Sequence, residues 1–377
     1  MDDLKQAVDL LNVPEKWLQP FEVVDPFSGL DLSGFLSLKP DSRYGALALL
    51  EVAGRPVPQQ ILATPKLHYP FNKKGEFHFP AIHHIDIYEK LDGTNVLAYR
   101  FMDANGEWHT TYKLRLYPVL RNGRWGNFLD MWKEVLERYP SISELPEINQ
   151  CSLSFELYGS RNPHLIAYKI PLDCALLFGI DPLGNCKPPG SLDASGIPTP
   201  RNFGNLSPHN NPVEEYQRIR EQLEKEVQTL EGGTLSGSEG TVWYVTTATD
   251  EVVLFKCKPE SVEAIHWKGG ISKEAVIATC WNLLETEDDI QYPSLERLLL
   301  EEYLQDDIDR FREHIDKCIE AVMVDLDFRK RVLDAYKATG VKISDDKGAV
   351  MRILSQQFPR GDMKRVYHEI VTFGNDQ

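Results

Sequence analysis

The segment IYEKLDGTN, residues 87–95, contains a lysine that could act as a nucleophile. Lys90 follows an apolar, β-rich stretch, and residues two apart on a strand share a face, which would put Asp92 beside it. Gly93 allows a tight turn or a close approach to a ligand. A lysine amine is a poor nucleophile while protonated, and neighbouring cations or burial favour its reactive neutral form. By itself, the segment fits a charged strand end before an Asp-Gly turn equally well.

A pair of lysines occurs in VVLFKCKP, where Lys256 and Lys258 are two residues apart on one predicted strand. They would point to the same side, where an anion such as phosphate would relieve their mutual repulsion. Lysines also protect solvent-facing edge strands from aggregation. Taken alone, the edge-strand interpretation is favoured.

Three other strand residues could help to hold a nucleotide. Glu239, before the strand TVWYV, could bind Mg²⁺ beside a phosphate. Glu156, on the polar face of LSFELYG, could accept hydrogen bonds from ribose hydroxyls. Phe178, near the end of CALLFGID, could stack on a purine. Each also has a common non-functional interpretation, as an exposed turn acid, a solvated strand acid or a core aromatic.

The order of these segments is more informative than any one of them. KLDGTN, FELYG, LLFGID, EGTV and KCK follow one another within residues 63–268. In this order they resemble the nucleotide-binding motifs of the covalent nucleotidyltransferase superfamily, which comprises polynucleotide ligases and mRNA-capping enzymes. Single motifs of this kind often match by chance, whereas five in order rarely do.

Two features of the sequence resemble those of the ATP-dependent RNA ligases in that superfamily: the last residue of the first motif and the region after the nucleotide-binding motifs. Asn95 ends the first motif, where DNA ligases and capping enzymes usually carry arginine. Residues 269–377 are predicted to be helical, whereas those enzymes usually append a small β-barrel. The resemblance therefore implies an ATP-dependent RNA ligase that seals 5′-phosphate and 3′-hydroxyl RNA ends through a covalent lysyl-AMP and an adenylylated RNA.

The resemblance also implies roles for individual residues. Lys90 would attack the α-phosphate of ATP, while Lys256 and Lys258 neutralise its charge. Asp92 would orient the lysine or contact metal-bound water, and Mg²⁺ or Mn²⁺ would be held by Glu239 and Asp92. The implied nucleotide-binding residues are Glu89, Lys90, Asn95, Arg115, Glu156, Phe178, Glu239, Lys256 and Lys258.

The family also has a basic residue at the end of the hairpin after the first motif, where it touches the nucleotide or the RNA end. Residues 110–125 contain no acidic residue. They carry four basic residues, Lys113, Arg115, Arg121 and Arg124. Arg115 is preferred because it closes the second strand, with Lys113 and Arg121 as alternatives, and Asn95 is a further candidate for RNA contact. A solvated basic loop is the plain interpretation.

The elements that would position these residues can be predicted from periodicity. VLAYRF, DANGE and WHTTYKLRL predict a strand, a turn and a strand, and therefore a hairpin. LSFELYG, ALLFGID, TVWYVTT and VVLFKCK predict further strands. NFLDMWKEVLERY and VEEYQRIREQLEKEVQTL predict helices, the second ended by Gly232-Gly233.

The chain divides into three predicted parts. Residues 1–62 form an accessory region, in which DDLKQAVDLL predicts a helix, YGALALLEV a buried strand, and PFSGLDLSG and AGRPVP turns. Residues 63–268 form an α+β nucleotidyltransferase (adenylyltransferase) domain of antiparallel sheets flanked by helices. Residues 269–377, after a boundary near Gly269-Gly270, form a mildly acidic, all-α domain.

Composition limits the cellular environment and the binding partners that we expect for this chain. The net charge of −16 argues against indiscriminate nucleic-acid binding, so any polyanion contact would have to be local. We expect no secretory signal and no membrane association, because the N-terminus is acidic and no apolar run reaches roughly 18 residues. Six cysteines without a CxxC pair indicate a reduced, cytoplasmic chain without a zinc site.

Several interpretations stay open at this point. A DNA ligase or a GTP-using capping guanylyltransferase would keep the covalent chemistry. A non-catalytic nucleotide- or RNA-binding module would keep the fold, although the joint presence of Lys90, Glu239 and the lysine pair argues against it. A helical scaffold with an incidental β domain makes no use of the motifs. The chain could be a monomer or a homodimer, and residues 1–62 have no predicted role.

Overall fold

The computed structural model describes residues 3–72, 75–123, 126–230, 235–259, 261–262, 271, 273–301 and 303–374. The predicted helix end at Gly232-Gly233 and the predicted boundary at Gly269-Gly270 lie outside these residues. The chain forms two compact units. Unit 1 comprises Met1–Ile265 and Leu284–Asp289, and unit 2 comprises His266–Leu283 and Ile290–Gln377. The division at residues 62 and 268 stays a prediction.

Unit 1 begins with helix α1 and a four-stranded antiparallel sheet in the order β1-β2-β3-β4. The bounds are α1 Asp3–Leu11, β1 Leu18–Val24, β2 Asp31–Ser37, β3 Leu47–Val52 and β4 Arg55–Ile61. The predicted helix and buried strand are confirmed, but the two predicted turns are partly wrong. Gly34 lies within β2, where a Cβ atom would come within 2.0 Å of the Ala48 carbonyl oxygen, and the prolines of RPVP lie on the edge strand β4, where proline is tolerated.

Unit 1 also contains two further antiparallel sheets. One has the order β10-β9-β8-β6-β7 and the other β11-β5-β14-β15. The bounds are β5 Ile82–Lys90, β6 Thr94–Met102, β7 Trp108–Leu114, β8 Ser152–Tyr158, β9 Asp173–Ile180, β10 Cys186–Lys187, β11 Asn202–Leu206, β14 Gly240–Thr247 and β15 Val252–Cys257. The predicted hairpin is confirmed as β6 and β7, and the four other predicted strands as β8, β9, β14 and β15.

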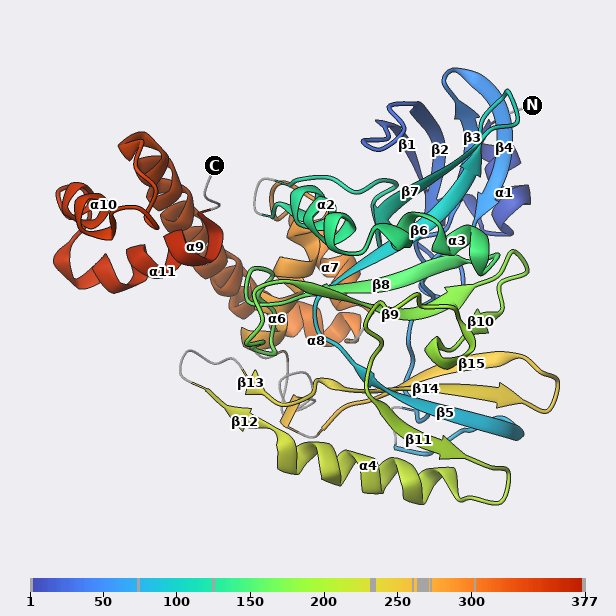
Figure 1. Cartoon of the computed structure of the whole chain (residues 1–377). Coiled ribbons are helices and arrows are strands. Elements are labelled where there is room, and N and C mark those ends of the chain that lie inside the picture. Colours follow the sequence, from blue (N-terminus) through green and yellow to red (C-terminus); the bar gives the residue numbers. More distant parts are fainter. Residues whose placement is uncertain are drawn as a thin grey trace. The chain divides into compact units, whose positions relative to one another are not determined.

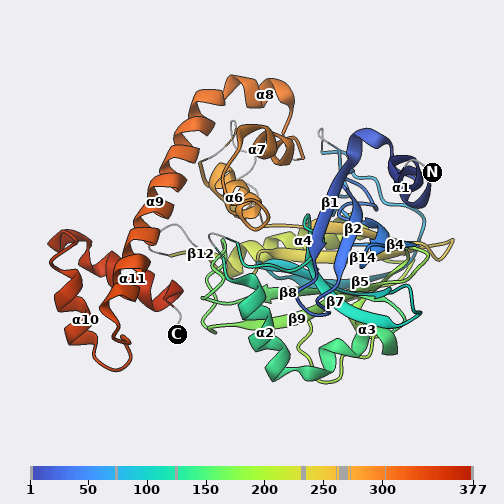
Figure 2. The same ribbon diagram turned by 90° about the horizontal axis from the view of Figure 1, so that it is seen from above.

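Two helices cover the outer faces of these sheets. Helix α2, Phe128–Arg138, packs against the sheet that contains β8. Its Trp132 contacts Phe155 of β8, with ring centroids 5.6 Å apart. Tyr216 of α4, Pro212–Glu226, packs against Trp243 of β14 at 5.5 Å. Figures 1 and 2 show α2 and α4 on opposite sides of the two sheets. Apolar side chains fill the space between helix and sheet on each side.

The second predicted helix is shorter than its sequence pattern suggests. It ends at Glu226 because Val227 adopts an extended conformation. The next residues pair as a short strand, β12 Gln228–Thr229, with β13 Leu235–Ser236. Strand pairing with the nearby segment β13 has therefore replaced the last turn of the predicted helix. The remaining short helices of unit 1 are α3 Leu145–Ile148 and the 3-10 turns Glu15–Trp17, Pro140–Ser143 and Pro189–Ser191.

Unit 2 is helical throughout its described residues. Its helices are α6 Lys273–Leu284, α7 Tyr292–Leu299, α8 Gln305–Arg310, α9 Arg312–Thr339, α10 Lys347–Leu354 and α11 Met363–Phe373, with a 3-10 turn at Arg360–Asp362. Apolar side chains of α9, α10 and α11 form one core, beside which Arg329 donates to Glu369 at 2.9 Å. Among the described helices, none is both long and apolar enough to cross a bilayer. The α+β class with an all-helical C-terminal region is confirmed.

Candidate active site

The short connection between β5 and β6 carries the predicted nucleophile. β5 ends at Lys90 in one sheet and β6 begins at Thr94 in the other, so Leu91–Gly93 cross between the two sheets. A Cβ atom on Gly93 would lie 2.3 Å from the Leu157 carbonyl oxygen, so the crossing requires glycine. The tight crossing keeps Lys90 and Thr94 at the same end of the two sheets.

Glu239 lies beside Lys90 because β14 runs antiparallel to β5, with Gly240 opposite Lys90. Its Oε2 pairs with Nζ of Lys90, and its Oε1 lies 2.7 Å from Nζ of Lys258. Burial by itself would raise the pKa of Glu239, but the ammonium groups of Lys258 and Lys90 outweigh it and lower the pKa to about 2. Glu239, only 5% exposed, is therefore an ionised carboxylate that bridges two cations.

The predicted lysine pair lies at the end of β15, but its two side chains have different neighbours. Lys258 pairs with Glu239, whereas Nζ of Lys256 lies 4.5 Å from the centroid of the Tyr69 ring. Gly240 lets β14 and β15 come together here, since a Cβ atom on it would lie 2.2 Å from the Cys257 carbonyl oxygen. The lysines are 8% and 9% exposed, which excludes the solvated edge-strand interpretation.

Strand β8 brings Glu156 into the same group of charges, opposite Asn95 of β6. Glu156 is 8% exposed, so it is not the solvated strand acid that its pattern also allowed. Burial raises its pKa to about 8; Lys90 opposes this shift, and Asp92 and Glu239 add to it. At neutral pH the protonated form therefore predominates, and this carboxyl group can donate a hydrogen bond.

Asp92 is held by the loop that connects β8 to β9. Its Oδ2 accepts a hydrogen bond from the Ile166 amide at 2.7 Å, and its own amide donates to the Tyr168 hydroxyl at 2.9 Å. Removal from solvent, followed by the charge of Glu239, raises the pKa of Asp92. One carboxylate oxygen is thus committed to the loop, which fixes the side chain relative to Lys90.

The same loop surrounds Thr94, and the sequence gives no indication of this. Nδ2 of Asn162 donates to the Thr94 hydroxyl at 3.1 Å and to the Leu157 carbonyl at 2.7 Å. Nε2 of His164 lies 3.4 Å from the same hydroxyl. The segment SRNPH looks like an ordinary turn, so only the folded chain assigns it to the site.

Glu285 is a second site residue without a sequence signal. It belongs to the part of unit 1 that follows α6. Its Oε1 accepts a hydrogen bond from the Thr94 hydroxyl at 2.7 Å and lies 3.8 Å from Nε2 of His164. Burial raises the pKa of Glu285, while His164 and the Thr94 hydrogen bond oppose the rise. A turn that follows α6, distant in sequence, therefore completes the surroundings of Thr94.

Asn95 and Phe178 contact other protein groups. Nδ2 of Asn95 donates to the Ser154 hydroxyl at 2.8 Å, and its Oδ1 accepts from the Thr64 hydroxyl at 2.8 Å. Phe178 is 4% exposed and packs edge-on against Tyr244, with ring centroids 6.4 Å apart. In this structure, Asn95 braces β6 against β8, and Phe178 belongs to the apolar core. Direct contact with a nucleotide would require both side chains to change partners.

Lys113 does not reach solvent. Its Nζ is fully buried and donates to the backbone carbonyls of Leu114 at 2.7 Å and Arg115 at 3.0 Å. Burial, with a smaller effect of Arg115, lowers its pKa to about 7. The alternative of Lys113 as an RNA contact is therefore not supported, because a buried amine held by carbonyls cannot meet a phosphate.

The two described arginines of this stretch are both engaged. Arg115 donates to the Pro65 carbonyl at 3.3 Å, and its guanidinium lies 4.9 Å from the centre of the Tyr44 ring. Arg121 donates to the Thr286 carbonyl at 2.5 Å and lies 3.6 Å from Asp288. Arg124 lies outside the described residues. The N-terminal region, which had no predicted role, thus supports Arg115 through Tyr44.

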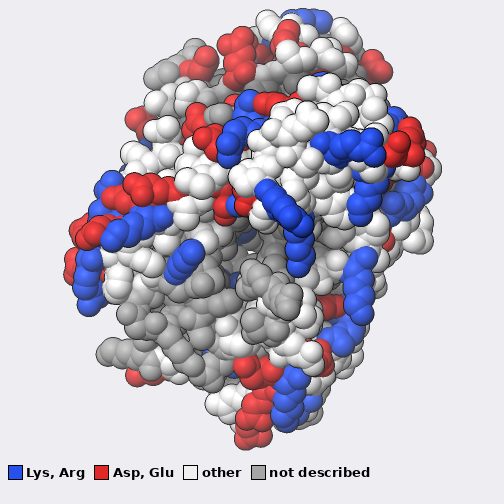
Figure 3. Space-filling view, turned by 90° about the vertical axis from the view of Figure 1, so that its left-hand side faces the viewer, with Lys and Arg blue, Asp and Glu red and all other residues white. Residues whose placement is uncertain are grey.

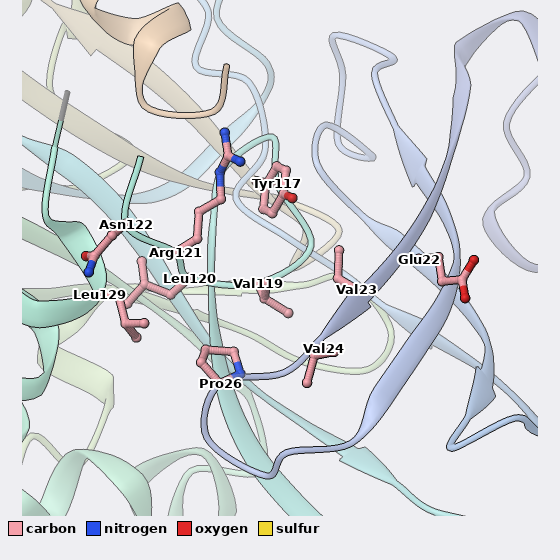
Figure 4. A pocket seen from close by; sticks show the side chains of 10 residues that line it. All are labelled: Glu22, Val23, Val24, Pro26, Tyr117, Val119, Leu120, Arg121, Asn122 and Leu129. Carbon is pink, nitrogen blue, oxygen red and sulfur yellow. The ribbon is translucent and has the colours of Figure 1, made fainter. Parts of the chain in front are cut away.

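Arg121 also lines a groove between β1 and the segment before α2. Figure 4 shows Arg121 and Tyr117 at one end of this groove and Val24 and Pro26 at the other. Its lining does not include the Lys90–Glu239 cluster. Glu89, predicted to bind ATP, alternates with Lys90 along β5, and its Oε2 lies 4.0 Å from Nε of Arg201.

The carboxylates beside Lys90 have the donor type that Mg²⁺ and Mn²⁺ prefer. Glu239 is ionised, and Asp92 accepts one hydrogen bond through Oδ2. Oxygen donors of this kind suit a hard divalent cation that keeps some of its waters. A different group, Asp103, Glu107 and His109, brings its ligand atoms within 4.8 Å of one another at the opposite end of β6.

No family model matches the chain, and a search of curated proteins finds no relative. Among solved structures, form 2 of an archaeal ATP-dependent RNA ligase has 17% identity and a TM-score of 0.47, with 87% of this chain and 81% of that chain covered. Form 1 has 15% identity and a TM-score of 0.45, with 97% and 98% covered. A chain from Aquifex aeolicus, described as an ATP-dependent DNA ligase, has 12% identity and a TM-score of 0.39, with 92% and 86% covered.

The similar structures are polynucleotide ligases. Two are described as RNA ligases and one as a DNA ligase. Because these TM-scores lie below 0.5, the function proposed below rests on the residues of this chain and their arrangement.

The raised pKa of Glu156 predicts a pH-dependent stability. Its value of about 8 in the folded chain exceeds the ordinary 4.5, so folding favours the protonated acid. This contribution is fully present below pH 4.5 and is lost as the pH rises through about 8. As the pH rises from 4.5 to about 8, the free energy of unfolding of the Glu156→Gln variant should therefore increase by about 1–3 kcal/mol relative to that of the parent protein.

Urea unfolding at a series of pH values measures this difference. Glu147→Gln is the matched control, because the Glu147 side chain is 66% exposed and should show no such gain. A difference between Glu156→Gln and the parent that stays constant from pH 4.5 to above pH 8 would contradict the assignment.

Proposed function

We propose that this chain is an ATP-dependent RNA ligase, which seals 5′-phosphate and 3′-hydroxyl RNA ends through a covalent AMP adduct on Lys90. The observation that carries the proposal is the contact of Lys90, Glu239 and Lys258, which lie in three motifs far apart in sequence. A structural role alone does not need a buried lysine and a half-buried lysine on one buried carboxylate, since such charges are costly to remove from water.

In the first step, the Lys90 amine attacks the α-phosphate of ATP. The ammonium proton of Lys90 first passes to water, and a phosphorus–nitrogen bond then forms as the bond to pyrophosphate breaks. Lys90 starts as half of an ion pair with Glu239, so its lone pair becomes available only after that proton is lost. The charge of Lys258, with Lys256 next to it on the strand, neutralises the α-phosphate as charge develops there.

Glu239 and Asp92 are the residues that would hold Mg²⁺ or Mn²⁺, and the ion would supply charge neutralisation to the departing pyrophosphate. The loop contact between Asp92 and Ile166 keeps the second carboxylate oriented toward this position. Glu156, protonated at neutral pH, is suited to hydrogen-bond a nucleotide hydroxyl as donor or acceptor.

In the later steps, AMP passes from Lys90 to the 5′-phosphate of an RNA, and a 3′-hydroxyl then displaces AMP to form the phosphodiester. Arg115 and Arg121 are the candidate contacts for RNA phosphates, since guanidinium groups bind phosphate oxygens in pairs. Asn95 would act indirectly, because its amide already fixes β6 against β8. We further propose that the enzyme works in a reducing cytoplasm, where its six buried free thiols stay reduced.

Replacing the nucleophile tests the first step. Lys90→Ala and Lys90→Arg should each lower the yield of covalent AMP adduct from labelled ATP by more than about 100-fold. Lys90→Arg keeps the positive charge beside Glu239 and therefore controls for folding. Lys258→Ala should slow adduct formation by about 10- to 100-fold, through loss of phosphate neutralisation.

Gel detection of the labelled protein, followed over time, measures these yields. Lys330→Ala is the matched control, because this exposed lysine of α9 pairs only with Asp334 among the interactions described and should leave the adduct unchanged. An adduct at the parent level in Lys90→Arg would rule out Lys90 as the nucleophile. An adduct with GTP but not with ATP would favour the capping-enzyme alternative.

The polymer substrate is tested by presenting the adenylylated protein with matched ends. Single-stranded RNA and nicked RNA with a 5′-phosphate should be joined, and RNA with a 5′-hydroxyl should not, because it offers no phosphate to accept AMP. Joining is measured by denaturing gel electrophoresis of labelled strands. Joining of nicked DNA alone would contradict the RNA assignment.

A further inference from the structure

An acidic segment of the chain lies on the basic part of the proposed site. Residues 284–289 read LETEDD and belong to unit 1, whereas the residues before and after them belong to unit 2. The chain therefore leaves the helical unit for six residues and then returns to it. Four of the six side chains are acidic, and we call this stretch the acidic segment.

The acidic segment contacts unit 1 at two places. Glu285 accepts a hydrogen bond from the hydroxyl of Thr94, which directly follows the Leu91–Gly93 crossing after Lys90. The Thr286 carbonyl accepts from Arg121, and the Asp288 carboxylate lies 3.6 Å from the same guanidinium. The segment thus spans from the first motif to the basic stretch after the hairpin.

The charges on the two sides are complementary. Burial raises the pKa of Glu285, and the charge of Arg115 is among those that oppose the rise, so both described arginines of the basic stretch act on the acidic segment. The Arg121 guanidinium also lies 4.4 Å from the centre of the Tyr117 ring. Tyr117 is half-buried, and an arginine beside an accessible aromatic edge is a combination that binds the backbone and the bases of single-stranded nucleic acids.

The acidic charge of the whole chain makes a local group of cations necessary for binding a polyanion. The chain has a net charge of −16, and Figure 3 shows Lys and Arg side chains interspersed with Asp and Glu over one face. A polyanion on such a surface needs a local group of cations. The Asp288 carboxylate and the Thr286 carbonyl occupy the Arg121 guanidinium, which is otherwise suited to phosphate oxygens.

Building on the proposed function, we propose that the surface formed by Arg115, Tyr117 and Arg121 binds the phosphate backbone of a single-stranded RNA end, and that the acidic segment covers it until RNA takes its place. Phosphates exchange with the carboxylate and carbonyl on Arg121, and a base stacks on Tyr117. Because the acidic segment must first leave Arg121, the apparent affinity of the protein for RNA is lower than the intrinsic affinity of the uncovered surface.

Neutralising the acidic segment tests this exchange. The double variant Glu285→Gln, Asp288→Asn keeps the side-chain shapes and should bind a 5′-phosphorylated, fluorescein-labelled single-stranded RNA about 5- to 10-fold more tightly than the parent. Fluorescence anisotropy with the full-length protein, at low and at moderate salt, measures the dissociation constant. Asp288→Asn alone, at an exposed position, should give a smaller gain and keeps the test valid if the double variant unfolds.

A matched control separates local exchange from net charge. Glu313→Gln, Asp334→Asn removes the same two charges from exposed positions on α9 and should change RNA affinity by less than about 2-fold. Arg121→Ala should weaken binding and should also abolish the gain from Asp288→Asn, because the two side chains act on each other. If the acidic variants bind RNA no more tightly than the control variant, the proposal is overturned.

Failure of the exchange at Arg121 can be distinguished from failure of the proposed ligase function. Adduct formation from ATP needs no RNA, so an inactive Lys90 would be seen without affecting the anisotropy measurement. Conversely, a normal adduct together with unchanged RNA affinity in the acidic variants would leave the ligase assignment intact and remove only the exchange at Arg121. Tighter binding to a protein polyanion such as a poly-glutamate peptide, without tighter RNA binding, would also contradict the proposal.

Discussion

A buried carboxylate between two lysines is the interaction on which the rest of the site depends. Glu239 would be costly to bury alone, and so would Lys90 and Lys258, but together they satisfy one another. This arrangement fixes the Lys90 side chain beside Glu239. In the proposed function, Lys258 would exchange this carboxylate for a nucleotide phosphate, and opening the Glu239 cluster would then accompany activation of Lys90.

The fold brings Lys90 to Glu239 at the point where the chain crosses from one sheet to the other. Lys90 ends a strand of one sheet and Thr94 begins a strand of the other, and Gly93 makes the short crossing possible. Gly240 allows β14 and β15 to come together next to Glu239. The glycines of KLDG and EG are thus explained by backbone contacts in this chain as well as by any close approach of a ligand.

Local pattern predicted much of this arrangement. The strands, the main helices and the position of Lys90 at a strand end follow from periodicity and turn chemistry, which act over a few residues. Glu239 was recognisable only through motif order, because its contact with Lys90 depends on pairing between β5 and β14. Glycine and proline in β2 and β4 predicted turns, since a sequence does not show where an edge strand or a close backbone contact will tolerate them.

The parts that sequence did not predict are those that depend on distant contacts. Asn162, His164 and Glu285 carry no motif, yet they surround Thr94. Lys113 looked like a solvent-facing cation, but it lies in the buried end of β7, where its amine donates to two carbonyls. Burial of this kind is decided by what packs over a segment, and here the N-terminal region, which seemed to lack a role, contributes Tyr44 beside Arg115.

The central claim is that Lys90, held by Glu239, is the residue that becomes adenylylated. Peptide mapping by tandem mass spectrometry, after incubation of the full-length protein with ATP and Mg²⁺, tests it most directly. The account predicts one added AMP, on the peptide that contains Lys90. An AMP located instead on Lys113, the buried amine whose pKa is lowered to about 7 by burial, would contradict it.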